Sequence, residues 1–308
     1  MRRSLGRQLL EFARTIRLEH SLFALPFALG TALLADPPCP APAAIALLVA
    51  CMVAARTAAM GFNRVADASI DARNPRTRDR AIPAGRLRRG TALALTLLSA
   101  AAFVAGAWGF WFLRGNLWPG LLAPAFLAVL FGYSYTKRFT VLTHWVLGLC
   151  LGLGPVGAWI ALRGSLALLP VLIGAAVVVW TAGFDILYAL LDLEVDRREG
   201  LKSVPSRLGS AGARHVALVS HAAALALLAA VLVADAAGAQ PLLGRASEAA
   251  LVLIAVAFGV QHLGFRRPPA TQSPSPGIPI PGLVWNAAVS ILWLAGVIVD
   301  VAARQAWA

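Results

Sequence analysis

The chain has 308 residues, of which 59% are hydrophobic and only 13% are charged, with a net charge of +13. A soluble globular domain carries about 25% charged residues, so this composition excludes that class and indicates a polytopic membrane protein. The basic residues are spread over many short connections and form no single patch, which argues against nucleic acid as a partner.

The first twenty residues predict a helix at the membrane surface. Leu9, Phe12 and Ile16 recur at helical intervals among basic residues, which is typical of an interfacial helix that leads into a first span. A cleaved signal peptide is the alternative, but Glu11 and Glu19 interrupt the apolar core that such a peptide needs. We therefore expect the lipid bilayer to contact the chain from its start.

A helix that crosses a bilayer needs about 20 mostly apolar residues. The stretches that meet this requirement number nine, near residues 18–35, 41–62, 91–113, 117–136, 141–162, 165–190, 213–234, 246–264 and 281–303. They are rich in Ala, Leu, Val and Gly, and small residues favour close packing of helices in lipid. The sequence predicts an all-α protein with one integral membrane domain over residues 1–308.

The distribution of Lys and Arg gives an independent check on the spans. Of the 27 basic residues, 22 fall on the N-terminal segment and the alternate connections, four fall on the other connections, and Arg56 lies within the second span. Cytoplasmic segments carry the excess of basic residues. This distribution predicts a multi-pass protein with a cytoplasmic N-terminus and, after nine crossings, an outside C-terminus.

A first polar cluster lies at the end of the second span. Asn63, Asp67 and Asp71 are spaced four residues apart, so a continuous helix would place them on one face. Arg56 lies seven residues before Asn63, two turns further into the membrane on that face. An isolated charge at bilayer depth costs roughly 2.5–3.5 kcal/mol, so this cluster requires a partner or a function.

A second cluster repeats the spacing with Tyr188, Asp192 and Asp196, and Asp185 lies seven residues before Asp192. Two oxygen-rich helix ends suit Mg²⁺ ions bridged by a diphosphate, because Mg²⁺ takes one or two carboxylates together with phosphate oxygens. Nearby basic residues such as Lys202 could neutralise the remaining phosphate charge. Surface ion pairs, worth about 0–1 kcal/mol each, are the alternative, but they do not account for the repeated spacing.

The two clusters resemble a known family. The stretch NRVADASID is similar to the NxxxDxxxD motif, and YALLDLEVD to the YxxxDxxxD motif, of the UbiA superfamily of intramembrane aromatic prenyltransferases. The stretches RTRDRAIPAG, YSYTKRFT and EGLKSVPSRLG also fit, so the resemblance covers nearly the whole chain. EHSLFALPFALG, MVAARTAAMGFNR and GFDILYALLDLEVDRREGL look most like the bacterial 4-hydroxybenzoate polyprenyltransferase branch, which includes members assigned to a dihydroxynaphthoate in menaquinone synthesis.

The resemblance implies nine transmembrane helices around a central cavity in the bacterial inner membrane, capped by the two motif loops. A polyprenyl diphosphate would lie with its tail among the helices and its head at the motifs. Its polyprenyl group would pass to the ring of a small aromatic acid, 4-hydroxybenzoate or similar, in quinone biosynthesis. The acceptor stays open, since 1,4-dihydroxy-6-naphthoate, haem, a chlorophyll precursor or homogentisate are alternatives.

The resemblance also implies Mg²⁺ as the cofactor and assigns roles by motif position. Asn63, Asp67 and Asp71 would bind one ion, and Asp192 and Asp196 the second, or Asp192 would face the acceptor. The four aspartates form the predicted catalytic set. The other predicted substrate-binding residues are Arg76, Arg80, Lys137 and Lys202 for phosphate oxygens, Arg138 for the acceptor carboxylate, and Arg56, Asp185 and Tyr188 in the cavity. The roles of Arg56, Glu19 and His20 stay open.

The implied chemistry suits this setting. Ionisation of an allylic diphosphate leaves a carbocation and a highly charged leaving group, which a metal and basic side chains stabilise in a dry site. A base then removes the ring proton. A transporter of an anionic solute is the distant alternative, because intramembrane charges also mark substrate pathways. The odd number of spans and the position of the charges at one edge favour the enzyme.

Overall fold

The structure is a computed structural model that describes residues 4–16, 23–265 and 281–306. Within these ranges no β-strand is assigned, which confirms the all-α class. The elements in chain order are α1 (Leu5–Ile16), α2 (Leu25–Ala35), α3 (Pro42–Ala66), α4 (Ala68–Arg73), α5 (Arg89–Arg114), α6 (Trp118–Thr136), α7 (Thr143–Arg163), α8 (Leu168–Ala189), η2 (Leu190–Asp192), α9 (Leu193–Arg198), α10 (Val204–Ala236), α11 (Arg245–Gly264) and α12 (Pro281–Ala306).

Eight helices of the described ranges are long and apolar enough to cross a membrane, and they match the second to ninth predicted spans. The first predicted span is described only from residue 23, and there α2 covers 11 residues. Such a helix is about 16 Å long, which is shorter than the ~30 Å hydrocarbon core. The described chain thus has eight long helices and one short apolar helix where nine spans were predicted. Glu19 and His20 lie outside the described residues.

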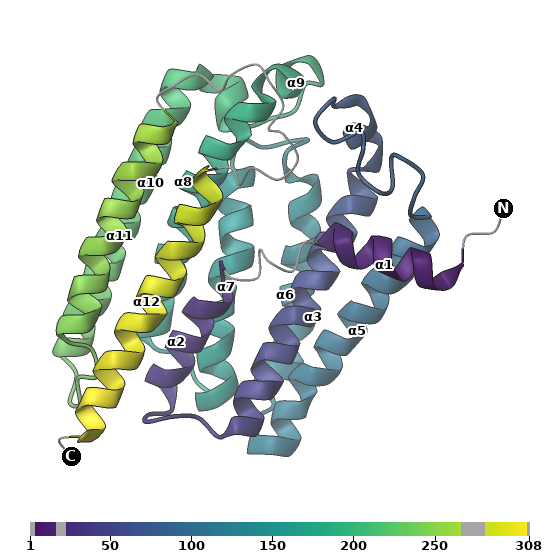
Figure 1. The fold of residues 1–308 in the computed structure, drawn as a ribbon. Coiled ribbons are helices and arrows are strands. Elements are labelled where there is room, and N and C mark those ends of the chain that lie inside the picture. Colours follow the sequence, from purple (N-terminus) through teal and green to yellow (C-terminus); the bar gives the residue numbers. More distant parts are fainter. Residues whose placement is uncertain (1–3, 17–22, 266–280, 307–308) are drawn as a thin grey trace.

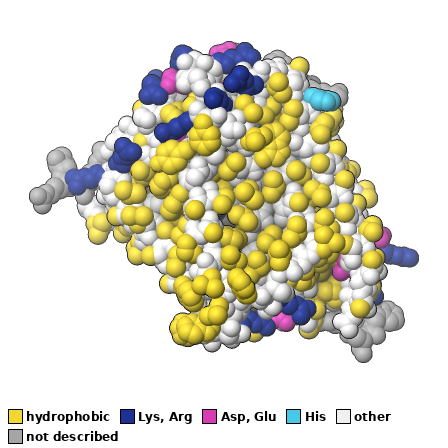
Figure 2. Space-filling model, turned by 180° about the vertical axis from the view of Figure 1, so that it is seen from behind, with side chains coloured by type: hydrophobic (Ala, Val, Ile, Leu, Met, Phe, Trp, Pro, Cys, Tyr) yellow, Lys and Arg dark blue, Asp and Glu magenta, His cyan; other side chains and the backbone are white. Residues whose placement is uncertain are grey.

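The long helices stand side by side, with α4 and α9 at one end of the bundle and the C-terminal end of α12 at the other (Figure 1). Figure 2 shows a broad hydrophobic surface across the middle of the molecule, with Lys and Arg side chains gathered mainly at the end that carries α4 and α9. This distribution matches a bundle embedded in lipid with its charges at the two water interfaces.

The short helix α2 joins two halves of the core because it is apolar on every face. The ring of Phe27 lies 5.3 Å from that of Trp180 in α8 and 6.0 Å from that of Trp293 in α12. Ala28 and Ala32 are fully buried in a second apolar cluster with side chains of α3, α5 and α7. Helix α2 therefore fixes α8 and α12 relative to α3 and α7.

Glycines set how closely α7 and α8 approach. A Cβ atom on Gly148 would lie 2.1 Å from the carbonyl oxygen of Val178, and one on Gly152 would lie 2.5 Å from that of Gly174. Only glycine fits at such backbone contacts, which small residues permit between membrane helices. This close packing fixes α8, the helix that leads into the second motif.

The N-terminal helix α1 runs across α3 (Figure 1). Phe12 and Ile16 are buried, whereas Leu5, Leu9 and Leu10 are exposed on its other side. The predicted helix is confirmed, and its exposed leucines are suited to a membrane surface.

Candidate active site between the two acidic motifs

Both motifs break their helix at the middle acidic residue. Asp67, with φ −93° and ψ 0°, separates α3 from the six-residue α4. Asp192, with φ −109° and ψ 7°, ends the 3₁₀ helix η2 that follows α8, and it precedes the six-residue α9. The helix is therefore interrupted within each motif, but the three motif side chains of each still line the same cavity. The two breaks have nearly the same geometry at the same end of the bundle (Figure 1).

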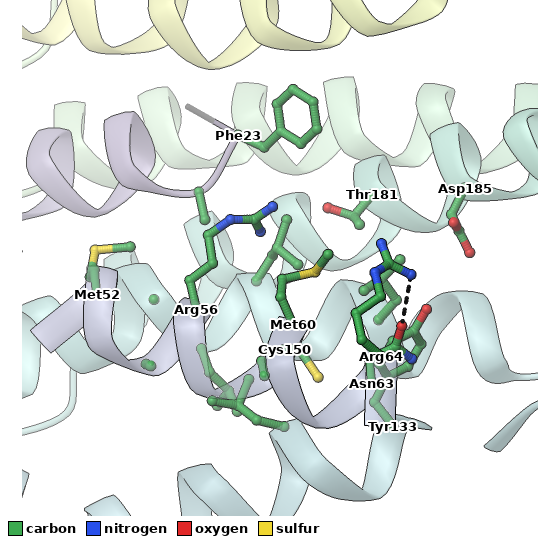
Figure 3. Close-up of a pocket in the computed structure, with 18 of the residues that line it drawn as sticks. Phe23, Met52, Arg56, Met60, Asn63, Arg64, Tyr133, Cys150, Thr181 and Asp185 are labelled. Atoms are coloured by element: carbon green, nitrogen blue, oxygen red, sulfur yellow. Dashed lines mark hydrogen bonds between the residues drawn. The ribbon is translucent and has the colours of Figure 1, made fainter. Parts of the chain in front are cut away.

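A cavity of about 860 Å³ joins the two motifs. Its wall contains every motif side chain, namely Asn63, Asp67, Asp71, Tyr188, Asp192 and Asp196. Away from the motifs, the wall becomes apolar and includes Phe110, Leu122 and Ile160. Figure 3 shows Asn63 and Arg64 on one wall with Asp185 and Thr181 across from them. The space is thus polar at one end and hydrocarbon-like at the other.

Asp67 is the most enclosed carboxylate of the first motif, with 3% of its surface exposed. Its Oδ2 atom accepts hydrogen bonds from Lys137 Nζ at 2.6 Å and from Asn63 Nδ2 at 3.1 Å. Its Oδ1 atom is buried and takes no hydrogen bond from any residue that the structure describes, although an Arg138 nitrogen lies 3.7 Å away. A buried carboxylate oxygen in this state can serve as a ligand for a hard cation.

Asp71 is held by the loop that follows its own motif. Nη1 of Arg80 lies 2.7 and 2.8 Å from the two carboxylate oxygens, and the Thr77 hydroxyl donates to the Asp71 carbonyl at 3.1 Å. Asp71 is 5% exposed, so this ion pair is largely shielded from water. Arg80 was predicted to contact phosphate, and here it balances a motif carboxylate.

Arg76 connects the two motifs. Its Nε atom donates to Asp192 Oδ1 at 2.8 Å, its Nη2 atom donates to Asp192 Oδ2, and its Nη1 atom donates to the Tyr188 hydroxyl at 3.2 Å. Asn74 adds a hydrogen bond of 3.0 Å to Asp192 Oδ1. Burial acts to lower the pKa of the Arg76 guanidinium, but the hydrogen bond and charge of Asp192 outweigh it and raise that pKa above its ordinary value. The loop after the first motif therefore places a permanently charged guanidinium group in contact with the second motif.

Asp196 accepts a hydrogen bond of 2.9 Å from the Ser203 hydroxyl. Ser203 also caps α10 through a reciprocal capping box with Ser206. Helix α10 begins at Val204, nine residues before the predicted span, and turns at Gly209, whose φ of 67° favours glycine. This early start brings the helix cap to the second motif.

The described residues contain no group of three or more His, Cys, Asp or Glu side chains close enough together to hold a metal ion. The carboxylates of Asp67, Asp71 and Asp192 are instead neutralised by Lys137, Arg80 and Arg76. The donor set still fits Mg²⁺, because it consists of hard oxygens around one cavity and includes the Oδ1 atom of Asp67, which takes no hydrogen bond from any described residue. Phosphate oxygens would supply the remaining ligands that such a site needs.

Two residues that were predicted to contact the substrates do not line the cavity. Arg138 donates to the Ala66 carbonyl at 2.8 Å and lies over the Tyr135 ring at 5.0 Å. Lys202 donates from Nζ to the Phe139 carbonyl at 3.0 Å. Their side chains brace the loop around the site.

Two predicted residues line the cavity closer to its middle. Arg56 projects from α3 near Met52 and Met60, with Phe23 on the facing wall (Figure 3). Asp185 lies on α8, and its Oδ2 atom is 2.7 Å from Nδ1 of His144 in α7. Sequence reasoning missed His144, because the partner lies 41 residues away and no local pattern marks the histidine.

Comparison with known proteins gives a consistent result. The model of the UbiA prenyltransferase family matches residues 24–275. The 4-hydroxybenzoate octaprenyltransferase of Azotobacter vinelandii is 34% identical over 212 residues, which cover 69% of this chain and 68% of that protein. A protein of the same name from Serratia proteamaculans is 32% identical over 56% of this chain and 58% of its own length.

Solved structures show the same fold. The apo structure of a UbiA homolog from Aeropyrum pernix K1 is 34% identical, covers 92% of this chain and 98% of its own, and has a TM-score of 0.79. A UbiA homolog from Archaeoglobus fulgidus bound to DMAPP and Mg²⁺ is 19% identical, covers 95% and 99%, and has a TM-score of 0.66. The arrangement of helices is thus shared with these proteins.

Proposed function

The chain belongs to the UbiA prenyltransferase family, and from this premise we propose that it transfers a polyprenyl group from a polyprenyl diphosphate to the ring of 4-hydroxybenzoate. The reaction releases diphosphate and supplies a step of quinone biosynthesis. The observation that carries this proposal is a cavity that joins both acidic motifs to a long apolar space. The names of the bacterial relatives support this acceptor.

The polar end of the cavity suits the diphosphate. Mg²⁺, held by the oxygens of Asn63, Asp67, Asp192 and Asp196, with Asp71 beside them, would supply charge stabilisation for the leaving diphosphate. Carboxylates that turn to the metal release their basic partners for phosphate oxygens. Those partners are Arg76, Arg80 and Lys137.

The middle of the cavity suits the aromatic acid. A carboxylate in this mostly apolar section needs a cation close to it. Arg56 lines the section, whereas the predicted partner Arg138 lies outside the cavity wall. We therefore assign the acceptor carboxylate to Arg56.

The far end of the cavity suits the polyprenyl tail. Small side chains, including Ala107, Ala123 and Ala161, line it beside Phe110 and Ile160. Burial of hydrocarbon contributes about 0.8 kcal/mol for each CH₂ group. The same apolar wall keeps water away from the allylic cation, which water would otherwise capture.

The surface charge supports an orientation in the bacterial inner membrane. The end of the bundle with α4 and α9 carries the larger share of Lys and Arg (Figure 2). By the positive-inside rule this end faces the cytoplasm, so the N-terminus is cytoplasmic and the C-terminus is outside. The diphosphate can then reach the motifs from the cytoplasm.

An acceptor panel tests the proposal. Purified protein in lipid nanodiscs, given Mg²⁺ and a labelled polyprenyl diphosphate, should form prenylated 4-hydroxybenzoate and release diphosphate. Product from 1,4-dihydroxy-6-naphthoate alone would move the assignment to menaquinone synthesis. Absence of product with every acceptor, together with solute flux in proteoliposomes, would favour the transporter alternative.

A further inference from the structure

We propose that Asp185 accepts the ring proton of the aromatic acceptor and that His144 is the positioning residue that holds Asp185 for this step. The inference rests on the proposed prenyl transfer and adds the two residues that complete it. Its basis is the hydrogen bond between His144 and Asp185, of which Asp185 lines the cavity.

The hydrogen bonds of His144 define its protonation. Its side chain is 2% exposed, and its Nε2 atom accepts a hydrogen bond of 3.2 Å from the backbone N–H of Val204. Because Nε2 acts as an acceptor, the ring proton lies on Nδ1, which donates to Asp185 Oδ2 at 2.7 Å. Val204 begins α10, where backbone N–H groups lack helical partners. The start of α10 therefore orients the imidazole, and the imidazole orients the carboxylate.

Asp185 differs from three of the four motif acids in the charge of its partner, and the fourth, Asp196, pairs with the Ser203 hydroxyl and is assigned to the metal. Asp67, Asp71 and Asp192 are each bound by a Lys or Arg side chain. A carboxylate beside a cation is a weaker base, and metal binding would weaken it further. The imidazole of His144 is neutral in this arrangement and donates to one oxygen of Asp185. The Asp185 side chain lines the cavity, where a ligand can meet it.

The position of Asp185 suits the acceptor ring. It lies on α8, seven residues before Asp192 in η2, and a helical rise over this interval places it about 10 Å further from the diphosphate end. Asn63 and Arg64 face it across the cavity (Figure 3). An aromatic ring placed between these walls would lie between the diphosphate at the motif end and the prenyl tail at the apolar end. The C1 atom of the prenyl group must reach the ring at this level of the cavity.

The step balances with these participants. The C1–O bond of the prenyl diphosphate breaks, and its electron pair leaves with the diphosphate. A pair of ring π electrons forms the new C–C bond to C1. The proton on that ring carbon passes to the Asp185 carboxylate, and the C–H electron pair restores the aromatic ring.

The test uses acceptor deuterated at the ring carbons beside the phenol. Asp185→Asn should lower product formation by about 10²–10⁴-fold, while Mg²⁺-dependent binding of the prenyl diphosphate changes less than about two-fold. Ring-proton loss should become rate-limiting in its residual turnover, which gives a primary deuterium isotope effect that the unsubstituted protein lacks. The ratio of prenylated product to released diphosphate should fall, because ionisation continues without productive capture.

Substitutions of His144 separate positioning from folding. His144→Phe should show the same isotope effect and a loss of about ten-fold or more, as expected for an outer hydrogen-bond partner. His144→Asn, whose amide can still donate to Asp185, should recover much of the product ratio. The matched control is His221→Asn, because His221 is as buried as His144 but pairs with His262 in α11.

Each outcome is informative. An unchanged isotope effect and product ratio in Asp185→Asn and His144→Phe would overturn the inference, as would loss of prenyl diphosphate binding in parallel with product. Loss of all product in Asp185→Asn with binding retained, and partial recovery in His144→Asn relative to His144→Phe, would support it. If the unsubstituted protein forms no product with any acceptor, the proposed function itself fails.

Discussion

The guanidinium of Arg76 binds both carboxylate oxygens of Asp192, and its Nε atom lies 2.8 Å from Oδ1. These residues are 116 positions apart, yet their contact joins the loop of the first motif to the helix break of the second. Asn74 and Tyr188 complete the link. The two motifs therefore form one structural unit before any ligand is considered.

Arg76→Lys should lower kcat/KM for the polyprenyl diphosphate by about 10- to 150-fold, because a lysine cannot bind two oxygens in parallel and a hydrogen bond to a charged group is worth about 1.5–3 kcal/mol. Steady-state kinetics at saturating acceptor would measure the loss. Arg73→Lys is the matched control, since Arg73 pairs with Glu199 and its side chain is 54% exposed. Equal losses in both variants would contradict a role at the diphosphate.

Asp67→Asn should lower product formation by about 10²-fold or more at saturating Mg²⁺, because the carboxylate ligand is lost while the shape of the side chain is kept. Loss of a residue that only supports a metal ligand costs roughly 10–100-fold, and loss of the ligand itself should cost at least as much as the upper end of that range. The remaining activity should require a higher Mg²⁺ concentration. Size-exclusion chromatography would verify that the fold is retained. Near-normal turnover with the usual Mg²⁺ dependence would remove Asp67 from the metal site.

Arg56→Leu should raise KM for 4-hydroxybenzoate by about 10- to 150-fold, since a charged hydrogen bond of about 1.5–3 kcal/mol is lost, and should leave KM for the prenyl diphosphate nearly unchanged. Arg138→Leu should have the smaller effect on acceptor KM. Parallel kinetic measurements on the two variants decide between them. A larger rise of the acceptor KM in Arg138→Leu than in Arg56→Leu would instead assign Arg138 as the partner of the acceptor carboxylate.

Ala161→Phe should lower kcat/KM for long polyprenyl diphosphates more than for short ones. Ala161 lines the apolar end of the cavity and is 3% exposed, so a phenyl ring would fill space that the tail needs. The control is Leu121→Phe on α6, because Leu121 is 55% exposed. A uniform loss for all chain lengths would show that the tail does not reach this end.

The spans were predictable because hydropathy marks each of them. The stretch 117–136 differs from α6 by one residue at its start, and 41–62 begins one residue before α3 and ends four residues before the helix does. The early start of α10 was not predictable, since its first turns are polar and its course changes at Gly209. Of the first predicted span, residues 23–35 are described, and α2 covers 11 of them.

The site was predictable as a set of residues but not as a geometry. Spacing located the motif aspartates, whereas the backbone breaks at Asp67 and Asp192 depend on loops that fold back over them. The side chains of Arg138 and Lys202 point away from the cavity because they donate hydrogen bonds to the backbone carbonyl groups of Ala66 and Phe139, and these contacts exist only in the folded chain. His144 has no signal in the sequence, because its meaning comes from a contact between α7 and α8.

The central claim is that the two motifs bind one magnesium diphosphate in one cavity. Equilibrium binding of a labelled polyprenyl diphosphate, with and without Mg²⁺, tests it in the unsubstituted protein, Asp67→Asn and Asp192→Asn. The account predicts one diphosphate for each chain, affinity that depends on Mg²⁺, and a large loss of affinity in each variant. Full affinity in either variant, or binding that ignores Mg²⁺, would contradict it.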